Sequence, residues 1–502
     1  MFWLIAAIGL ALFLFKELYR KRRKYPPGPT PLPLLGNMLS IMSDFPGITA
    51  YKEWKKRFGP IYTYWLGPWP IVTVNDYSTI QELFINDGET TADRVPFSSV
   101  SEVYRGGLYG IADTNGKVWR EQRRFALHTL RDFGLGKAEM QERILNETAD
   151  LLAQLENDCE TNGKTKPSKY MEKTVASVIN LTLFGFRFDQ EHESEFYRLN
   201  QLLKDQLQVL ANPLLVAFFS VPNLIPYIPF VRGKFEKVFK VRDAINGYFQ
   251  QHIDAHKKAI DYLNDDVGDF CDAYIKEMYK RKDDPDTSFH DKQFVNVCGD
   301  LWLAGVDTTA TTMGWGVIVL LHHPEVLSKL HDEFDRVIDS DRLITTNDKP
   351  ALPYTNAFLN EVQRWANIAP QNLLRRMNKE VTIGGVTIPE GASITPQISM
   401  LLADETVFPE PDKFKPERFL DGDGKLKTFK EFLPFSVGKR QCPGEGLAKM
   451  ELFLFFSNLT HRFHIENVDP SNPPSLVKQM KTGGKPGEFE CILRRRIMGD
   501  ST

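Results

Sequence analysis

The chain has 502 residues, of which 42% are hydrophobic and 25% charged; these proportions are ordinary for a folded soluble protein, and a mean hydropathy of -0.31 excludes a multi-span membrane protein. Basic residues number 62 and acidic residues 65, so the net charge of -3 gives no indication of a nucleic-acid partner. Five widely spaced cysteines indicate a reducing compartment, because a disulfide framework would need an even and denser set.

The N-terminal residues 2–15 are wholly apolar, and a basic block from Lys16 to Lys24 follows them. The run is shorter than the roughly 20 residues of a membrane span, so Leu18 and Tyr19 must contribute. A cleaved signal peptide would carry its charge before the apolar run and a small-residue cleavage site after it, and neither is present. We therefore expect a signal anchor over 1–19, with the rest of the chain cytosolic, and a basic, proline-rich linker over 20–30.

The next segments predict a small sheet and then helices. Residues 61–66 and 71–74 are β-type runs that flank a Gly-Pro-Trp-Pro turn. A helix is predicted to open at residues 119–125, where Trp119 and Arg123 are four residues apart and share a face. An indole donor beside a guanidinium suits a carboxylate, whereas the plainer interpretation is a solvated basic helix.

Residues 202–231 are unusually apolar and contain four prolines, which exclude a single long helix. They form either buried core or a surface that dips into a bilayer.

A long apolar helix is predicted further along, with one face made largely of small residues. This face carries Val297, Leu301, Ala304, Gly305 and Thr308. A flat face lets the helix axis pass close to a plane, and Gly305 with threonine back-bonding would distort the helix locally and admit O2 and water. Helix packing alone is the alternative explanation.

Two oppositely charged residues later in the chain have the spacing of an ion pair on one helix face. Glu361 and Arg364 are three residues apart on a predicted helix, and an exposed pair of this kind contributes only a few tenths of a kcal/mol. Arg418, in the segment 416–419, supplies a second guanidinium near aromatic residues.

The segment 435–446, FSVGKRQCPGEG, centres on Cys442, which is predicted to cap a helix whose first residue is Pro443. Unpaired backbone N–H groups and the helix dipole would stabilise a thiolate there. Phe435 supplies an aromatic wall, Gly438 lets the backbone pass close to a flat partner, and Arg440 adds a cation. A flat, anionic, metal-centred partner such as haem fits all three, although a buried, inert cysteine is the alternative.

The pattern Phe435-x-x-Gly438-x-Arg440-x-Cys442-x-Gly444 resembles the haem-binding signature of the cytochromes P450. The string RRFALHTLRDFGLGK, which begins at Arg123, is similar to animal microsomal family-2-like members. The resemblance implies a mainly α (α+β) fold, with a helical prism, a small β-rich N-terminal subdomain and an N-terminal membrane anchor helix. Residues 31–502 would form the catalytic domain.

The resemblance also assigns roles to individual residues. Cys442 would be the axial ligand of haem b, Thr308 would hydrogen-bond the iron-bound dioxygen species, and Asp307 would belong to the proton relay. Glu361, Arg364 and Arg418 would form a structural triad behind the haem. The remaining haem contacts implied by the resemblance are Arg440, Trp119, Arg123 and Arg375 at the propionates, Ala304 and Gly305 on the helix, and Phe435, Gly438 and Gly444 in the cysteine loop. Arg375 belongs to segment 370–376, which resembles a pocket-lining strand, and the adjacent Arg376 is the alternative there.

The implied activity is a monooxygenase that hydroxylates or epoxidises lipophilic small molecules such as fatty acids, steroids or xenobiotics. The chain has no Gly-x-Gly-x-x-Gly nucleotide loop, so NADPH would act through a separate NADPH-cytochrome P450 reductase, with cytochrome b5 as a further partner. The location implied is the endoplasmic reticulum membrane. The alternatives are a reductase-independent isomerase or dehydratase of oxygenated lipids and a non-catalytic haem- or lipid-binding protein, for which Asp307 and Thr308 would be unnecessary.

Overall fold

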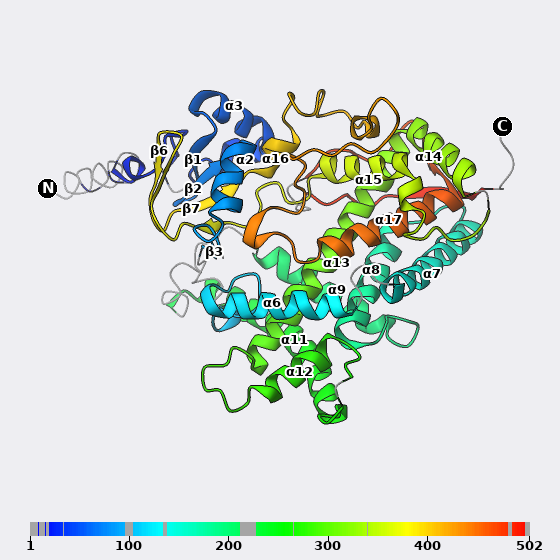
Figure 1. Ribbon diagram of the computed structural model, residues 1–502, viewed down its shortest axis with the longest axis horizontal. Coiled ribbons are helices and arrows are strands. Elements are labelled where there is room, and N and C mark those ends of the chain that lie inside the picture. Colours follow the sequence, from blue (N-terminus) through cyan, green and yellow to red (C-terminus); the bar gives the residue numbers. More distant parts are fainter. Residues whose placement is uncertain are drawn as a thin grey trace. The chain divides into compact units, whose positions relative to one another are not determined.

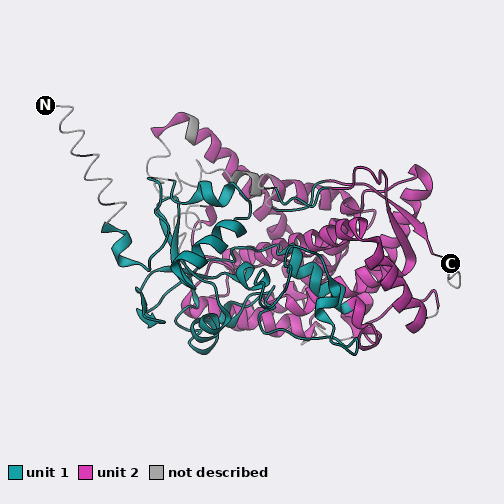
Figure 2. Cartoon of the chain, turned by 90° about the horizontal axis from the view of Figure 1, so that it is seen from above, with its two compact units in different colours: residues 1–95, 356–442, 475–487 teal, residues 96–355, 443–474, 488–502 magenta. Residues whose placement is uncertain are grey.

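The computed structural model describes residues 9, 16, 20–33, 35–95, 104–133, 138–210, 227–264, 266–338, 340–479 and 484–496. These residues form two compact units, coloured separately in Figure 2. Unit 1 comprises Met1–Val95, Asn356–Cys442 and Ser475–Gly487, and unit 2 comprises Pro96–Thr355, Pro443–Pro474 and Glu488–Thr502. The predicted anchor lies outside the described residues except for Gly9 and Lys16, and the same holds for 211–226 of the predicted apolar segment.

Unit 1 is built on a five-stranded sheet of order β1-β2-β7-β4-β3 (Figure 1). Strands β1 (Ile61–Leu66) and β2 (Trp69–Val74) form an antiparallel hairpin, which confirms the predicted pair, with β2 beginning two residues early. Gly67 at the turn has φ +58°, a conformation that favours glycine. β2 then pairs in parallel with β7 (Ser393–Pro396), so late sequence joins the N-terminal strands.

The remaining elements of unit 1 are short. They are η2 (Arg22–Lys24), α2 (Met38–Met42), α3 (Ile48–Phe58), α4 (Tyr77–Ile80), η3 (Gln81–Asn86), β3 (Asp93–Arg94), β4 (Arg375–Arg376), β5 (Val381–Ile383), β6 (Val386–Ile388), α16 (Ile398–Leu402), η6 (Pro416–Phe419) and η7 (Gly438–Arg440). The predicted strand over 370–376 is therefore reduced to its last two residues. Helix α15 (Pro353–Ala366) lies mostly in unit 1 and begins in unit 2.

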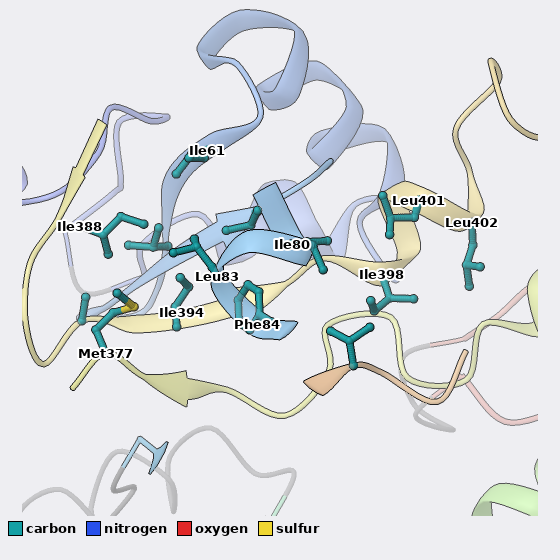
Figure 3. Close-up of a cluster of buried hydrophobic side chains, with 14 residues drawn as sticks. Ile61, Ile80, Leu83, Phe84, Met377, Ile388, Ile394, Ile398, Leu401 and Leu402 are labelled. Atoms are coloured by element: carbon teal, nitrogen blue, oxygen red, sulfur yellow. The ribbon is translucent and has the colours of Figure 1, made fainter. Parts of the chain in front are cut away.

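A hydrophobic cluster connects the sheet of unit 1 to the segment before Cys442. Figure 3 shows side chains of η3, such as Leu83 and Phe84, packed with Ile394 of β7 and Met377. Val437, 3% exposed, belongs to the same cluster, and Phe432 and Leu433 pack against it. Burial of these side chains, worth about 1.5–3 kcal/mol each, fixes the chain just before the cysteine loop.

The described part of unit 2 is dominated by helices and includes an antiparallel strand pair. The helices are α6 (Gly116–Asp132), α7 (Ala138–Asn162), α8 (Pro167–Phe184), α9 (Glu193–Leu210), α11 (Pro229–Ala259), α12 (Phe270–Lys280), α13 (Asp291–His322), α14 (Pro324–Val337), η5 (Lys349–Ala351) and α17 (Glu445–Arg462), and the strands are β8 (Phe463–Asn467) and β9 (Cys491–Arg495).

Helix α13, green in Figure 1, is the central element of unit 2 and packs against α8, α11 and α17. It begins where the His290 side chain accepts a hydrogen bond from the Gln293 N–H, and it is continuous through 301–308. The predicted local distortion at Gly305 is therefore wrong, although Thr308 does bond back to the helix as expected. Among the described helices, α13 is the one with the length and apolar content of a membrane span, and 61% of its most apolar window is buried in the protein, as in a core helix.

Candidate active site

The loop that carries Cys442 is held against η3 in unit 1. The Cys442 N–H donates to the Phe435 carbonyl at 3.0 Å, which closes the loop around the turn η7. Gly438 has φ +67°, and a Cβ there would lie 1.7 Å from the Phe84 carbonyl oxygen. Only glycine permits this approach. The close neighbour that Gly438 accommodates in the structure is thus the backbone of η3.

One buried guanidinium group, that of Arg440, belongs to this loop, and another, that of Arg375, contacts it. Arg375, 1% exposed, donates from Nη2 to the Val437 carbonyl at 2.7 Å and the Ser436 hydroxyl at 3.1 Å. Arg440, 5% exposed, donates from Nε to the Ala92 carbonyl at 2.5 Å. Arg376 is exposed, so the structure favours Arg375 over its neighbour as the internal cation. Buried cations need anionic or hydrogen-bonding partners, which suits them to a ligand with carboxylates.

Glu361, Arg364 and Arg418 form an ion-pair network, and it lies in the interior of unit 1 and not on its surface. Arg364 donates to both carboxylate oxygens of Glu361, at 2.7 and 2.8 Å, and Arg418 Nε donates at 3.1 Å. The Glu361 side chain is 0% exposed and those of the two arginines 2% and 7%.

The network also fixes the chain that leads to the cysteine loop. Arg364 and Arg418 donate to backbone carbonyls, which belong to Leu402, Pro409, Glu410, Pro411 and Lys413. Phe419 directly follows Arg418, and its ring centroid lies 4.9 Å from that of Phe432. Phe432 packs against the cluster that contains Val437, so packed residues connect the triad to the loop.

The helix that follows the cysteine begins later than predicted. α17 begins at Glu445 with Gly444 as its N-cap, so Cys442 precedes the cap by two residues and Pro443 is not the first helical residue. The prediction that Cys442 itself caps the helix is wrong. The short Pro443-Gly444 turn lies between them, and Glu445 occupies the first turn, where an acidic side chain complements the helix dipole.

In unit 2, the middle of α13 presents small side chains. Ala304 and Thr308, one turn apart, are exposed, although most of the neighbouring helix is buried. The Thr308 hydroxyl donates to the Ala304 carbonyl at 2.7 Å. A Cβ at Gly305 would lie 2.6 Å from Ile179 of α8, so this glycine serves the packing of two helices. Asp307 is half-buried on the same turn.

Helix α6 presents Trp119 and Arg123 together, as predicted from their spacing. The Arg123 guanidinium carbon lies 6.0 Å from the Trp119 ring centroid. Trp119 is 4% exposed, whereas Arg120 and Arg124 are exposed. The helix is therefore amphipathic, with a buried face at Trp119 and a solvated basic face at Arg120 and Arg124.

Sequence reasoning missed Asp300, which lies one turn before Ala304 on α13 and fixes the loop over residues 104–115. Its Oδ2 accepts from the N–H groups of Ile111 at 2.8 Å and Ala112 at 3.0 Å, and its Oδ1 pairs with Arg105 at 2.9 Å. An acidic residue inside an apolar helical run was the available signal.

Glu451 was missed for a similar reason. It lies on α17, 1% exposed, and its Oε2 accepts from the Thr309 hydroxyl at 3.3 Å. Burial raises the pKa of this carboxyl to about 8. It is an acid within the apolar run ELFLFF, and it holds a proton at neutral pH beside Thr309, the residue that follows Thr308.

This raised pKa predicts a pH-dependent stability. A neutral buried carboxyl contributes its full stability below the unfolded value of 4.5, and the contribution is lost as the pH rises toward about 8. Glu451→Gln should therefore gain stability relative to the parent by roughly 1 kcal/mol per pH unit across this window. The urea midpoints of the two proteins, compared at several pH values, measure this difference in stability. Glu445→Gln on the same helix is the control, and parallel curves for Glu451→Gln and the parent would contradict the assignment.

The donor set of the chain fits a thiolate-bound haem. All five cysteines lie in the described part, and Cys442 is the exposed one among them. Burial raises the pKa of the other four thiols, so these are poorly suited to ionise; they are Cys159, Cys271, Cys298 and Cys491. Arg375 and Arg440 in unit 1, and separately Trp119 and Arg123 in unit 2, carry N–H groups of the kind that bind carboxylates.

Comparison with known proteins agrees with this chemistry. The family model described as Cytochrome P450 matches residues 26–491. Cytochrome P450 2H2 of Gallus gallus is 36% identical over 467 residues, which are 93% of this chain and 92% of the relative. Cytochrome P450 2A9 of Mesocricetus auratus is 33% identical over 498 residues (99% and 97%), and cytochrome P450 2C1 of Oryctolagus cuniculus is 35% identical over 466 residues (92% of each).

Together with the mainly helical fold and its small sheets, these matches define a haem b monooxygenase, an oxidoreductase that uses O2. The chain belongs to the cytochrome P450 family. Membership implies a redox partner and a lipophilic substrate.

Proposed function

We propose that this chain is a membrane-attached monooxygenase of the endoplasmic reticulum, with residues 1–19 as anchor, 20–30 as linker and 31–502 as a cytosolic catalytic domain. It hydroxylates or epoxidises lipophilic small molecules with electrons from a separate NADPH-cytochrome P450 reductase, with cytochrome b5 as an additional donor. The observation that carries the proposal is the exposed Cys442 in its closed loop, in a chain of this family. When bound, the haem supplies the iron centre at which O2 is activated.

In unit 1, Cys442 acts as the iron ligand, and Phe435, Gly438 and Gly444 shape the loop around it. Arg440 and Arg375 bind propionate carboxylates, for which their buried guanidinium groups are suited. Glu361, Arg364 and Arg418 act structurally, through the packed residues that connect them to the loop.

In unit 2, Trp119 and Arg123 donate to a propionate from one face of α6. Ala304 and Gly305 keep the side chains of α13 small. Thr308 holds a proton at its hydroxyl, which can turn from the Ala304 carbonyl to a reacting oxygen, and Asp307 restores that proton from solvent.

Replacing Thr308 by alanine tests these roles. With purified reductase, we expect Thr308→Ala to consume NADPH at a rate similar to the parent but to convert a much smaller fraction of it into hydroxylated product, because the proton donor is lost. The measurement is product formed per NADPH oxidised.

Thr312→Ala is the matched control, since the Thr312 hydroxyl donates to the Thr308 carbonyl at 2.9 Å one turn along the same helix. It should retain the parent's coupling. Equal coupling in Thr308→Ala and the parent would refute the role of Thr308. Conversion of an oxygenated lipid by the parent without reductase or NADPH would refute the monooxygenase proposal in favour of an isomerase.

A further inference from the structure

A surface pocket of unit 1 lies where the basic linker meets strand β1. Its volume is about 200 Å³. The lining residues combine two cations with an aromatic and proline-rich wall: Arg22, Arg23, Tyr25, Pro26, Pro27, Gly28, Thr63 and Trp65. No carboxylate is among these lining residues.

The linker packs directly against strand β1. The Thr63 N–H donates to the Pro27 carbonyl at 3.0 Å, and a Cβ at Gly28 would lie 1.9 Å from the Thr63 carbonyl oxygen. The backbone on this side of the pocket is therefore in close contact with the strand, and glycine is required at position 28.

On the cationic side of the pocket, hydrogen bonds hold one arginine side chain in place. Arg22 is half-buried, and its Nη2 donates to the Gly28 carbonyl at 3.0 Å while its Nη1 donates to the Thr30 hydroxyl at 3.3 Å. Arg23 is exposed beside it. Because one guanidinium is already oriented, little side-chain entropy is lost when an anion binds, and guanidinium groups match the geometry of phosphate.

Thr63 lines the pocket without an accessible hydroxyl. It is 2% exposed, and its hydroxyl has no hydrogen-bond partner in the part of the chain that the structure describes. Trp65 is 3% exposed, with the Tyr25 ring edge-on at 6.1 Å and the Lys21 ammonium 6.0 Å from its ring centroid. Tryptophan and tyrosine beside cations suit a polar head group attached to apolar chains.

We propose that this pocket binds a phosphate group, and that its source is the head group of an anionic phospholipid in the membrane to which the chain is attached. The proposal rests on the membrane attachment proposed above for its lipid source, and on the pocket alone for its phosphate chemistry. Two guanidinium groups without a lining carboxylate select an anion, and the aromatic wall favours an amphiphile over a free ion.

The test uses the full chain with haem bound, in nanodiscs of phosphatidylcholine containing a minor fraction of phosphatidic acid. Native mass spectrometry counts the phosphatidic acid molecules that stay with the released protein. Arg22→Gln/Arg23→Gln should retain roughly tenfold less phosphatidic acid than the parent, because two charge-assisted contacts are lost. Arg20→Gln/Lys24→Gln is the matched control, since it removes the same charge from exposed residues outside the lining.

If the control retains phosphatidic acid and the Arg22 and Arg23 variant loses it, the result supports binding in the pocket. If both variants lose it equally, or neither loses it, the proposed pocket site is overturned, because bulk attraction to the bilayer would explain the binding. Displacement of phosphatidic acid by inorganic phosphate at an equal concentration overturns the lipid source.

If the chain does not enter nanodiscs, the proposed membrane attachment is wrong. Equilibrium dialysis of the same variants against glycerol 3-phosphate then tests the pocket alone, and equal uptake by both overturns it.

Discussion

Cys442→Ser is expected to abolish monooxygenase activity and the far red-shifted Soret band that a sulfur-bound haem gives when it is first reduced and then binds carbon monoxide. Serine has a similar shape, so the loop closed by the bond from the residue 442 N–H to the Phe435 carbonyl should persist. Its hydroxyl does not ionise at neutral pH, and the thiolate ligand is lost. Difference spectra and product assays with purified reductase measure both effects.

Cys159→Ser is the matched control. Cys159 is half-buried in α7, and burial raises the pKa of its thiol, so this variant should keep the red-shifted band and the activity. A Cys442→Ser protein that shows the same band as the parent would contradict the assignment of the ligand.

The second large effect is expected at Glu361. Replacing it by glutamine removes the charge that compensates two guanidinium groups in the interior of unit 1, and breaking a buried pair of this kind costs about 3–5 kcal/mol. The Lys415 N–H, which donates to Glu361 Oε1 at 2.9 Å, also loses its charged acceptor. We therefore expect Glu361→Gln to unfold at a much lower urea concentration and to lose haem on expression.

Glu410→Gln provides the comparison, because Glu410 is an acid of the same segment that pairs with Lys413 and Lys415 at the surface. Exposed pairs are screened by solvent, so its unfolding midpoint should stay near that of the parent. Equal midpoints in the two variants would mean that Glu361 is not structural. Haem content measured in parallel tests whether loss of the network reaches the Cys442 loop.

The sequence predicted an element correctly where the residues of one short segment determine its structure. The β1–β2 hairpin follows from two β-type runs around a Gly-Pro turn, and α13 follows from its apolar length. The proximity of Trp119 and Arg123 follows from helical spacing alone. Resemblance to a family, not periodicity, associated Arg418 with Glu361, which lies far from it in the chain.

Long-range neighbours explain what the sequence did not predict. The close partner of Gly438 is the Phe84 carbonyl, some 350 residues earlier, and that of Gly305 is Ile179, so local patterns could not distinguish these contacts from contacts with a cofactor. The buried state of Glu451 depends on α13 packing against α17. The start of α17 was misplaced because Pro443 and Gly444 are both compatible with a helix N-terminus, and the local sequence does not decide between them.

The contact between Gly438 and η3 limits how the cysteine loop can be varied. Any side chain at position 438 would clash with the Phe84 carbonyl oxygen of η3 and would strain the left-handed backbone. A substitution there must therefore move the cysteine loop away from η3. A library that randomises residues 435–441 and selects for haem incorporation should therefore return glycine at 438 almost without exception. Lys439, whose side chain is 52% exposed, should accept many residues, which makes it a suitable position for retuning the loop.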